Sequence, residues 1–250
     1  MSPKAPDERV AFLIAGVQKG GTTALFEYLA EEPGLSLSAT KELHFFDDET
    51  QDWARPDTGA YHANFPPFDG RPRGDATPIY CYWPNSLERI AAYNPAMKLI
   101  VVLRDPVERA WSHWRMEYAR GTEKGSFSWC IREGRQRMFD ADPWGFHRDL
   151  SYVERGYYGE QLDRLFALFP RDQALLLRSE DLRGRPGPAL ASVRAFLDLP
   201  KGKAPRRREA HVGAEMDYGG ALAADDVAHL RQVYARDQAR LEALTGIRFG

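Results

Sequence analysis

A glycine-rich turn near the amino terminus constrains the fold of this chain more than any other stretch. The apolar run 10–15 gives way to a turn that ends at Gly21, and a helical pattern begins at Thr22 and Thr23. This order predicts a strand, a loop and a helix, which bring free backbone N–H groups and the positive end of a helix dipole to one point. We expect Thr22 and Thr23 to cap the helix and Lys19 to add a mobile cation, an arrangement that suits phosphate or sulfate.

The spacing of this turn differs from that of the loop that binds nucleoside triphosphates. That loop requires G-x-x-x-x-G-K-[ST], with lysine directly after the last glycine. Gly16 and Gly21 keep the glycine spacing, but Thr22 stands in the place of the lysine and Lys19 lies inside the turn. The pattern therefore predicts an anion-binding loop of another kind. A tight strand-to-helix turn without a ligand remains the alternative.

Hydrophobic patterning along the rest of the chain predicts an α/β fold. Short apolar runs predict strands near 10–15, 35–38, 72–76, 97–103 and 174–177. Amphipathic segments predict helices at 23–31, 84–93, 157–169, 188–197 and 224–244, and Asp105-Pro106 would cap another. We expect one domain over residues 1–250, with residues 1–9 flexible, built on a doubly wound parallel sheet with helices on both faces. Active residues should lie at the carboxyl ends of the strands.

The composition limits the classes of protein to consider. The 250 residues are 43% hydrophobic and 28% charged, which suffices for a full core. The formal net charge of −2 disfavours a general nucleic-acid or membrane-surface binder. Cys81 and Cys130 form no metal-binding or disulfide pattern, so we expect no metal and a reducing compartment. The start of the chain resembles neither a signal peptide nor a membrane span.

Several ordered motifs resemble those of sulfotransferases that use 3′-phosphoadenosine 5′-phosphosulfate (PAPS). The blocks are similar to the heparan-sulfate-type branch and its bacterial relatives, and they occur in that family's order at 18–25 (QKGGTTAL), 41–47 (KELHFFD), 75–78 (DATP), 94–95 (NP) and 103–110 (LRDPVERA). The resemblance implies in-line transfer of a sulfuryl group to the hydroxyl or amine of a small-molecule or glycan acceptor, with release of 3′,5′-bisphosphoadenosine (PAP). Golgi relatives carry an amino-terminal membrane anchor, so its absence here suggests a cytoplasmic enzyme of the bacterial type.

Glu42 is the expected general base, both from its position and from the resemblance. It follows a predicted strand, and apolar neighbours such as Leu43 can tune a carboxylate for proton transfer. His44 would face the same side in an extended segment and orient the acceptor or share the proton. A surface pair of Glu42 with Lys41, and a packed His44 without a role, are the alternatives.

The donor nucleotide is expected to contact residues from several parts of the chain. The resemblance assigns the 5′-phosphosulfate to Lys19, Gly20, Gly21, Thr22 and Thr23, the 3′-phosphate to Arg104 and Ser112, and the nucleotide to Tyr158 and the basic loop with Arg206 and Arg207. Arginine offers a bidentate contact to phosphate and serine a neutral donor. An ion pair of Arg104 with Asp105 or Glu108, core packing of Tyr158 and a solvated basic loop are the alternatives.

The acceptor side departs from the eukaryotic pattern. Ala76 replaces a lysine that those relatives place before Thr-Pro, and the acidic segment 47–57 would repel a polyanionic chain if it bordered the acceptor. The aromatic residues near it, which could form a wall for a neutral sugar, a phenol or a lipid alcohol or belong to the core, are Trp53, Tyr61, Phe65, Phe68 and Trp83. Two other functions stay open: a phosphoryl transferase with Asp105 on magnesium, and a non-catalytic nucleotide-binding module.

Overall fold

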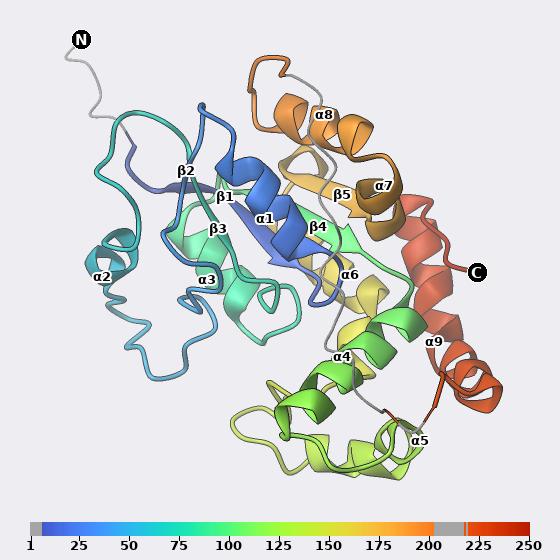
Figure 1. The fold of residues 1–250 in the computed structure, drawn as a ribbon. Helices are drawn as coiled ribbons and strands as arrows, with labels where there is room; N and C mark the ends of the chain where they lie inside the picture. Colours follow the sequence, from blue (N-terminus) through green and yellow to red (C-terminus); the bar gives the residue numbers. More distant parts are fainter. Residues whose placement is uncertain (1–6, 203–217, 219) are drawn as a thin grey trace.

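The computed structural model describes residues 7–202, 218 and 220–250, and its centre is a five-stranded parallel sheet (Figure 1). The strand order is β2-β3-β1-β4-β5, and every neighbouring pair is parallel. The strands are β1 (Val10–Gly16), β2 (Ser36–Leu37), β3 (Arg73–Ala76), β4 (Lys98–Leu103) and β5 (Ala174–Arg178). The predicted α/β class and all the predicted strand positions are confirmed.

The six helices with predicted positions begin and end within a few residues of them, and three further short helices are present among the described residues. The helices are α1 (Thr22–Ala30), α2 (Thr58–His62), α3 (Ser86–Tyr93), α4 (Pro106–Arg120), α5 (Phe127–Cys130), α6 (Tyr158–Leu168), α7 (Ser179–Gly184), α8 (Pro186–Phe196) and α9 (Ala224–Thr245). Asp105 accepts hydrogen bonds from the Val107 and Glu108 amides at the start of α4, as predicted for a cap followed by proline. No sequence pattern predicted the short α7.

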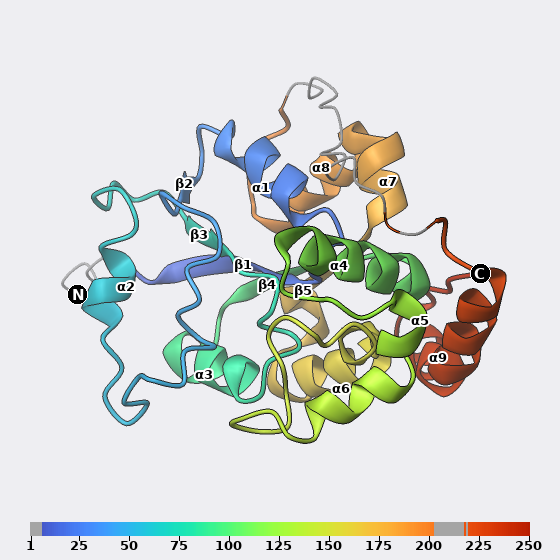
Figure 2. The ribbon, with the colours of Figure 1, turned by 60° about the horizontal axis from the view of Figure 1, so that its bottom comes forward.

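Helices cover both faces of the sheet. One core cluster joins one face of the strands to α1, α7 and α8, through residues such as Leu25, Leu182 and Leu190. The other face packs on α3, α6 and α9, with Ile90 and Leu162 at its centre. A third cluster packs α4 and α5 against α9 (Figure 2). Both cysteines, Cys81 and Cys130, are buried and free.

Most of the aromatic side chains proposed as an acceptor wall belong to the core instead. Tyr61, Phe65 and Trp83 are at most 7% exposed, and Tyr61 stacks on Phe45 with 4.3 Å between ring centroids. The partly buried Trp53 packs against the same cluster. The expectation of an aromatic wall for the acceptor is therefore wrong for Tyr61 and Phe65, because these rings are buried in the hydrophobic core.

A buried carboxylate under the sheet edge fixes the segment that carries Glu42. Asp75, on β3, accepts hydrogen bonds from the Tyr80 hydroxyl at 3.1 Å and from the hydroxyl of Thr77. The Tyr80 hydroxyl oxygen in turn accepts a hydrogen bond from the Phe45 amide at 3.1 Å. Burial raises the pKa of Asp75 to about 6, although the hydrogen bond from Tyr80 opposes this shift. Asp75 thus couples β3 to the backbone three residues after Glu42.

We expect Asp75→Asn to gain stability relative to the wild type as the pH rises from about 4 to about 7. Because the pKa of Asp75 is higher in the folded chain than the ordinary 3.8, its contribution is complete below pH ~4 and is lost as the pH rises through about 6. The gain in the free energy of unfolding of Asp75→Asn relative to the wild type over this pH range should approach about 3 kcal/mol. Urea unfolding at a series of pH values measures it, and parallel pH profiles for the two proteins would contradict the assignment.

Candidate active site

The glycine-rich turn packs directly against the backbone of the neighbouring strand. The Val17 amide donates a hydrogen bond to the Val102 carbonyl of β4 at 3.2 Å. A Cβ atom on Gly20 would lie 2.2 Å from the same oxygen, so no larger residue fits without moving the strand or the loop. Gly21 has a φ of 104°, a conformation that glycine adopts without strain.

The start of α1 leaves backbone amides open at the end of the sheet. The predicted side-chain cap by Thr22 or Thr23 is wrong, because Gly21 occupies the cap position in a left-handed conformation with no side-chain cap. The Gly20 amide, which was expected to bind the 5′-phosphosulfate, is occupied, because it donates a hydrogen bond to the Val17 carbonyl at 2.9 Å. The amides of Thr22 and Thr23 lie in the first turn, where an α-helix has no carbonyl to offer them. They remain available to an anion.

Lys19 extends from the turn toward α4. Its backbone is left-handed, with a φ of 66°, and its Nζ lies 3.5 Å from the Met116 Sδ. Burial lowers the pKa of Lys19, and the nearby charges of Arg120 and Arg104 lower it further. Three cations therefore converge on the turn, as an anion-binding site requires.

Arg104 lies beside the turn, at the carboxyl end of β4. Its guanidinium donates to the Lys19 carbonyl at 3.4 Å and to Glu108 at 3.2 Å, so the ion pair considered as the alternative is present. Its Nε is buried without a partner among the described residues. Burial, followed by the charge of Arg183, lowers the pKa of Arg104. One donor nitrogen of Arg104 thus has no hydrogen-bond partner among the described residues.

The other residues expected at the nucleotide have different environments. Tyr158 is fully buried in the core, and its hydroxyl donates to the Arg104 carbonyl at 2.9 Å, so it supports Arg104 through the backbone. Ser112 is half-buried on α4, about two turns from the amino-terminal end of that helix. Arg206 and Arg207 lie outside the described residues.

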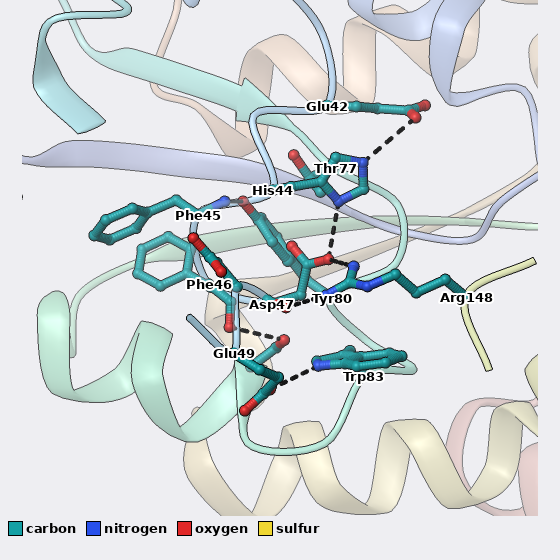
Figure 3. Close-up of polar contacts among 12 residues, drawn as sticks. Glu42, His44, Phe45, Phe46, Asp47, Glu49, Thr77, Tyr80, Trp83 and Arg148 are labelled. Carbon is teal, nitrogen blue, oxygen red and sulfur yellow. Dashed lines mark hydrogen bonds and ion pairs between the residues drawn. The ribbon is translucent and has the colours of Figure 1, made fainter. Parts of the chain in front are cut away.

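Glu42, His44 and Asp47 form a connected row at the carboxyl edge of the sheet (Figure 3). The Glu42 Oε2 lies 3.9 Å from the His44 Nε2, and the His44 Nδ1 lies 2.9 Å from the Asp47 Oδ2. The Asp47 side chain is completely buried and also binds Arg148, through its carboxylate and its backbone carbonyl. The hydrogen bond to Asp47 raises the pKa of His44 above 6.5.

Two details of this row differ from the sequence expectations. The Glu42 side chain is 44% exposed and pairs with Lys41 through Oε1, so it has no apolar enclosure, and the surface pair considered as the alternative is present. The segment is not extended, because Glu42 and His44 both have left-handed backbones, with φ values of 65° and 54°. The two side chains still meet, since two left-handed residues turn the chain around the intervening Leu43.

A cavity of about 250 Å³ connects this row with the glycine-rich turn, and its wall is formed by Gln18, Glu42, His44, Pro78, Ile79, Arg120, Arg148, Asp149 and Arg155. Arg155 is 4% exposed and donates to Gln18 at 2.8 Å and to the Ser151 hydroxyl at 2.8 Å. Burial lowers the pKa of Arg155 to about 10. Gln18, adjacent to Lys19, thus faces the same cavity as Glu42.

The arginines of this cavity were not recognised in the sequence. Arg120 ends α4, and Arg148 and Arg155 lie in a charged stretch after it; none of the three belongs to a motif, and only their contacts give them a place at the site. The acidic segment 47–57 led us to expect a negatively charged acceptor side, but the cavity beside Glu42 is lined by more cations than anions. Asp47, counted as part of a repelling acidic surface, is buried and neutralised by Arg148.

The comparisons with known proteins agree with the fold and identify the family. The model of the sulfotransferase domain matches residues 10–212, and the chain therefore belongs to the sulfotransferase family of enzymes. Heparan sulfate glucosamine 3-O-sulfotransferase 3B1 of Homo sapiens is 31% identical over 195 residues, covering 76% of this chain and 46% of that protein. The Mus musculus 3-O-sulfotransferase 6 is 33% identical over 196 residues, with coverages of 76% and 52%. The resemblance inferred from the motifs is confirmed, and the chain spans about half the length of these curated relatives.

Solved structures show the same architecture. A sulfotransferase from Alicyclobacillus acidocaldarius has a TM-score of 0.81 at 25% identity, covering 96% of this chain and 97% of that one. Mouse SULT7A1 complexed with PAP has a TM-score of 0.55 at 12% identity, with coverages of 96% and 90%, and shows the fold alone. In the described part of the chain, no helix has the length and apolar character to cross a membrane. No group of three or more potential metal ligands gathers within those residues.

We expect Asp47→Asn to lower the pKa of His44, because the hydrogen bond and the charge that favour the imidazolium are removed. The wild-type His44 should titrate above its ordinary 6.5. NMR titration of the His44 ring protons measures both values. Asp48→Asn, a change in the next residue, is the matched control and should leave the titration unchanged. An equal pKa in Asp47→Asn and wild type would show that Asp47 does not hold the His44 proton.

Proposed function

We propose that this chain is a PAPS-dependent sulfotransferase with Glu42 as the general base. One observation carries the proposal: the anion-binding turn with Lys19 and Arg104 adjoins a cavity that contains Glu42 and His44. The curated relatives are named as sulfotransferases, and mouse SULT7A1 is complexed with PAP. Donor and acceptor groups would meet at the carboxyl edge of the sheet, where parallel α/β folds bind their ligands.

The donor side fits a nucleotide with two phosphate positions. The amides of Thr22 and Thr23 and the Lys19 ammonium would hold the 5′-phosphosulfate, and Gly20 allows the close approach of the loop to β4. Arg104, with an unpartnered Nε, and Ser112 on the following helix would hold the 3′-phosphate. Lys19 would also stabilise the charge that develops on the departing phosphate.

The acceptor side supplies a path for one proton. The acceptor oxygen or nitrogen attacks the sulfur, the bond from sulfur to the phosphate oxygen breaks, and PAP leaves with that electron pair. Glu42 accepts the acceptor proton as the new bond forms. His44, 3.9 Å from Glu42, orients the carboxylate or the acceptor, and Asp47 fixes the His44 ring through Nδ1.

The structure disfavours the phosphoryl-transfer alternative. Asp105, its expected magnesium ligand, accepts the Val107 amide at 2.9 Å and the Glu108 amide at 3.1 Å, and pairs with Arg231 at 2.7 Å. These contacts occupy the carboxylate as a helix cap. A binding module without catalysis would not require the strained backbones of Glu42 and His44 beside an anion site.

We expect Glu42→Gln to lower turnover by about 10²-fold or more while PAP affinity stays nearly unchanged, because the base acts on the acceptor. PAP release from PAPS, assayed with a panel of neutral sugars, phenols and heparan precursors, measures turnover, and calorimetry measures PAP binding. Glu242→Gln, an exposed change on α9, is the matched control. Near-normal turnover of Glu42→Gln would refute the assignment.

We expect Arg104→Ala to weaken PAP binding by about 1.5–3 kcal/mol and Ser112→Ala by about 1 kcal/mol, because a charged contact to phosphate is stronger than a neutral one. Binding of AMP, which lacks the 3′-phosphate, should change much less. Arg185→Ala, an exposed arginine that pairs with Asp181, serves as the control in the same calorimetry. Equal losses for PAP and AMP would exclude a contact of Arg104 or Ser112 with the 3′-phosphate.

A further inference from the structure

A second cavity, of about 530 Å³, adjoins the one that contains Glu42. Arg148 and Asp149 line both cavities. The other residues of the second cavity are Asp48, Glu49, Thr50, Trp83, Ala141, Asp142, Pro143, Phe146 and His147. Its volume lies within the range of small-molecule sites, roughly 300–1,000 Å³. A larger chamber, which the proposed donor and base do not use, therefore lies next to the cavity that contains Glu42.

Arg148 lines both cavities and so forms the partition between them. Figure 3 shows its guanidinium directed toward Asp47. Its guanidinium lies 4.2 Å from the centroid of the Trp83 ring and binds the buried Asp47 carboxylate. Asp47 thereby neutralises the positive charge of Arg148, and the Trp83 ring fixes the plane of the Arg148 guanidinium. A molecule that passes from one cavity to the other lies along this partition.

The second cavity has the opposite electrostatic character to the first. Asp48, Asp142 and Asp149 have no cation within ion-pair distance anywhere in residues 7–202, 218 and 220–250. Glu49 is neutralised by Arg89 at 2.9 Å. Burial lowers the pKa of His147 below 6.5, so this ring is neutral at neutral pH. Within the described residues, three carboxylates without an ion-pair partner thus line this cavity, and one of them, Asp149, also lines the first cavity and interacts there with the charge of Arg155.

Aromatic rings and carboxylates together define the chemistry of an occupant. Phe146 adds a ring surface to the wall and is supported by Tyr82 with 5.0 Å between centroids, while the buried Trp83 lines the cavity beneath Arg148. Carboxylates accept hydrogen bonds from hydroxyl and amine donors, and ring faces pack against the C–H face of a saturated ring. A sulfated or carboxylated unit would be repelled by Asp48, Asp142 and Asp149.

We propose that the second cavity is an acceptor subsite for an uncharged or amine-bearing sugar ring, placed so that a hydroxyl or amine of the same acceptor reaches Glu42. The inference rests on the proposed sulfotransferase function and names its acceptor class. It distinguishes this chain from an enzyme for polyanionic chains, because the acceptor would extend from a cationic reaction cavity into an anionic chamber. The acidic segment that begins at Asp48 thus supplies part of the selectivity.

Ligand-observed NMR at low ionic strength tests the subsite with three matched probes. We expect glucosamine to bind more tightly than N-acetylglucosamine, and glucuronate to bind most weakly, to the PAP-saturated protein. Asp142→Asn should weaken glucosamine binding about two- to five-fold, as one partly exposed charge pair predicts. Asp142→Lys should weaken it further. Asp140→Asn removes another exposed carboxylate, two residues away, that does not line the cavity, and should have no effect.

Three results would overturn the subsite: glucuronate binding as tightly as glucosamine, unchanged glucosamine binding in Asp142→Lys, or equal losses in Asp142→Asn and Asp140→Asn. Calorimetry of PAP on the same samples separates this inference from the proposed function. Normal PAP binding without sugar selectivity would remove the subsite alone. Sugar selectivity without PAP binding would overturn the sulfotransferase assignment.

Discussion

The buried ion pair between Asp47 and Arg148 joins parts of the chain that are 101 residues apart. Without Arg148, the Asp47 carboxylate would be an uncompensated charge in a fully buried position, which costs several kcal/mol. Asp47 in turn holds His44, and His44 lies next to Glu42. The arrangement of the side chains proposed to react therefore depends on an interaction that neither segment contains by itself.

Backbone strain coincides with the proposed reaction site. In the described part of the chain, five non-glycine residues have a positive φ, and three of them are Lys19, Glu42 and His44. Such conformations cost on the order of 1 kcal/mol or more and persist where the surrounding contacts enforce them. Here the enforcing contacts are the packing of Gly20 on β4 and the bonds of Phe45 and Asp47 to buried partners. The site is thus held in place by the core beneath it.

Local patterns in the sequence predict the sheet and the residues that follow its strands. Glu42 was proposed both from the resemblance of its motif and from its place directly after a strand, because a parallel sheet brings such positions to one edge. Arg148 and Arg155 carried no local signal, because their places depend on contacts with Asp47 and Gln18 far away in the sequence. The predicted side-chain cap by Thr22 is wrong for another reason. The left-handed Gly21 before it occupies the cap position, and no side chain caps the helix.

The strand order has a consequence for how enzymes of this architecture can diverge. β1 and β4 are neighbours at the centre of the sheet, and the loops after them carry Lys19 and Arg104. The two cavities are instead lined largely by chain excursions outside the sheet, including Asp48, Asp142 and Arg148. Substitutions or insertions in these excursions leave the strand pairing intact. If the proposed sites hold, a lineage can therefore exchange one acceptor for another while the proposed donor-binding loops stay unchanged.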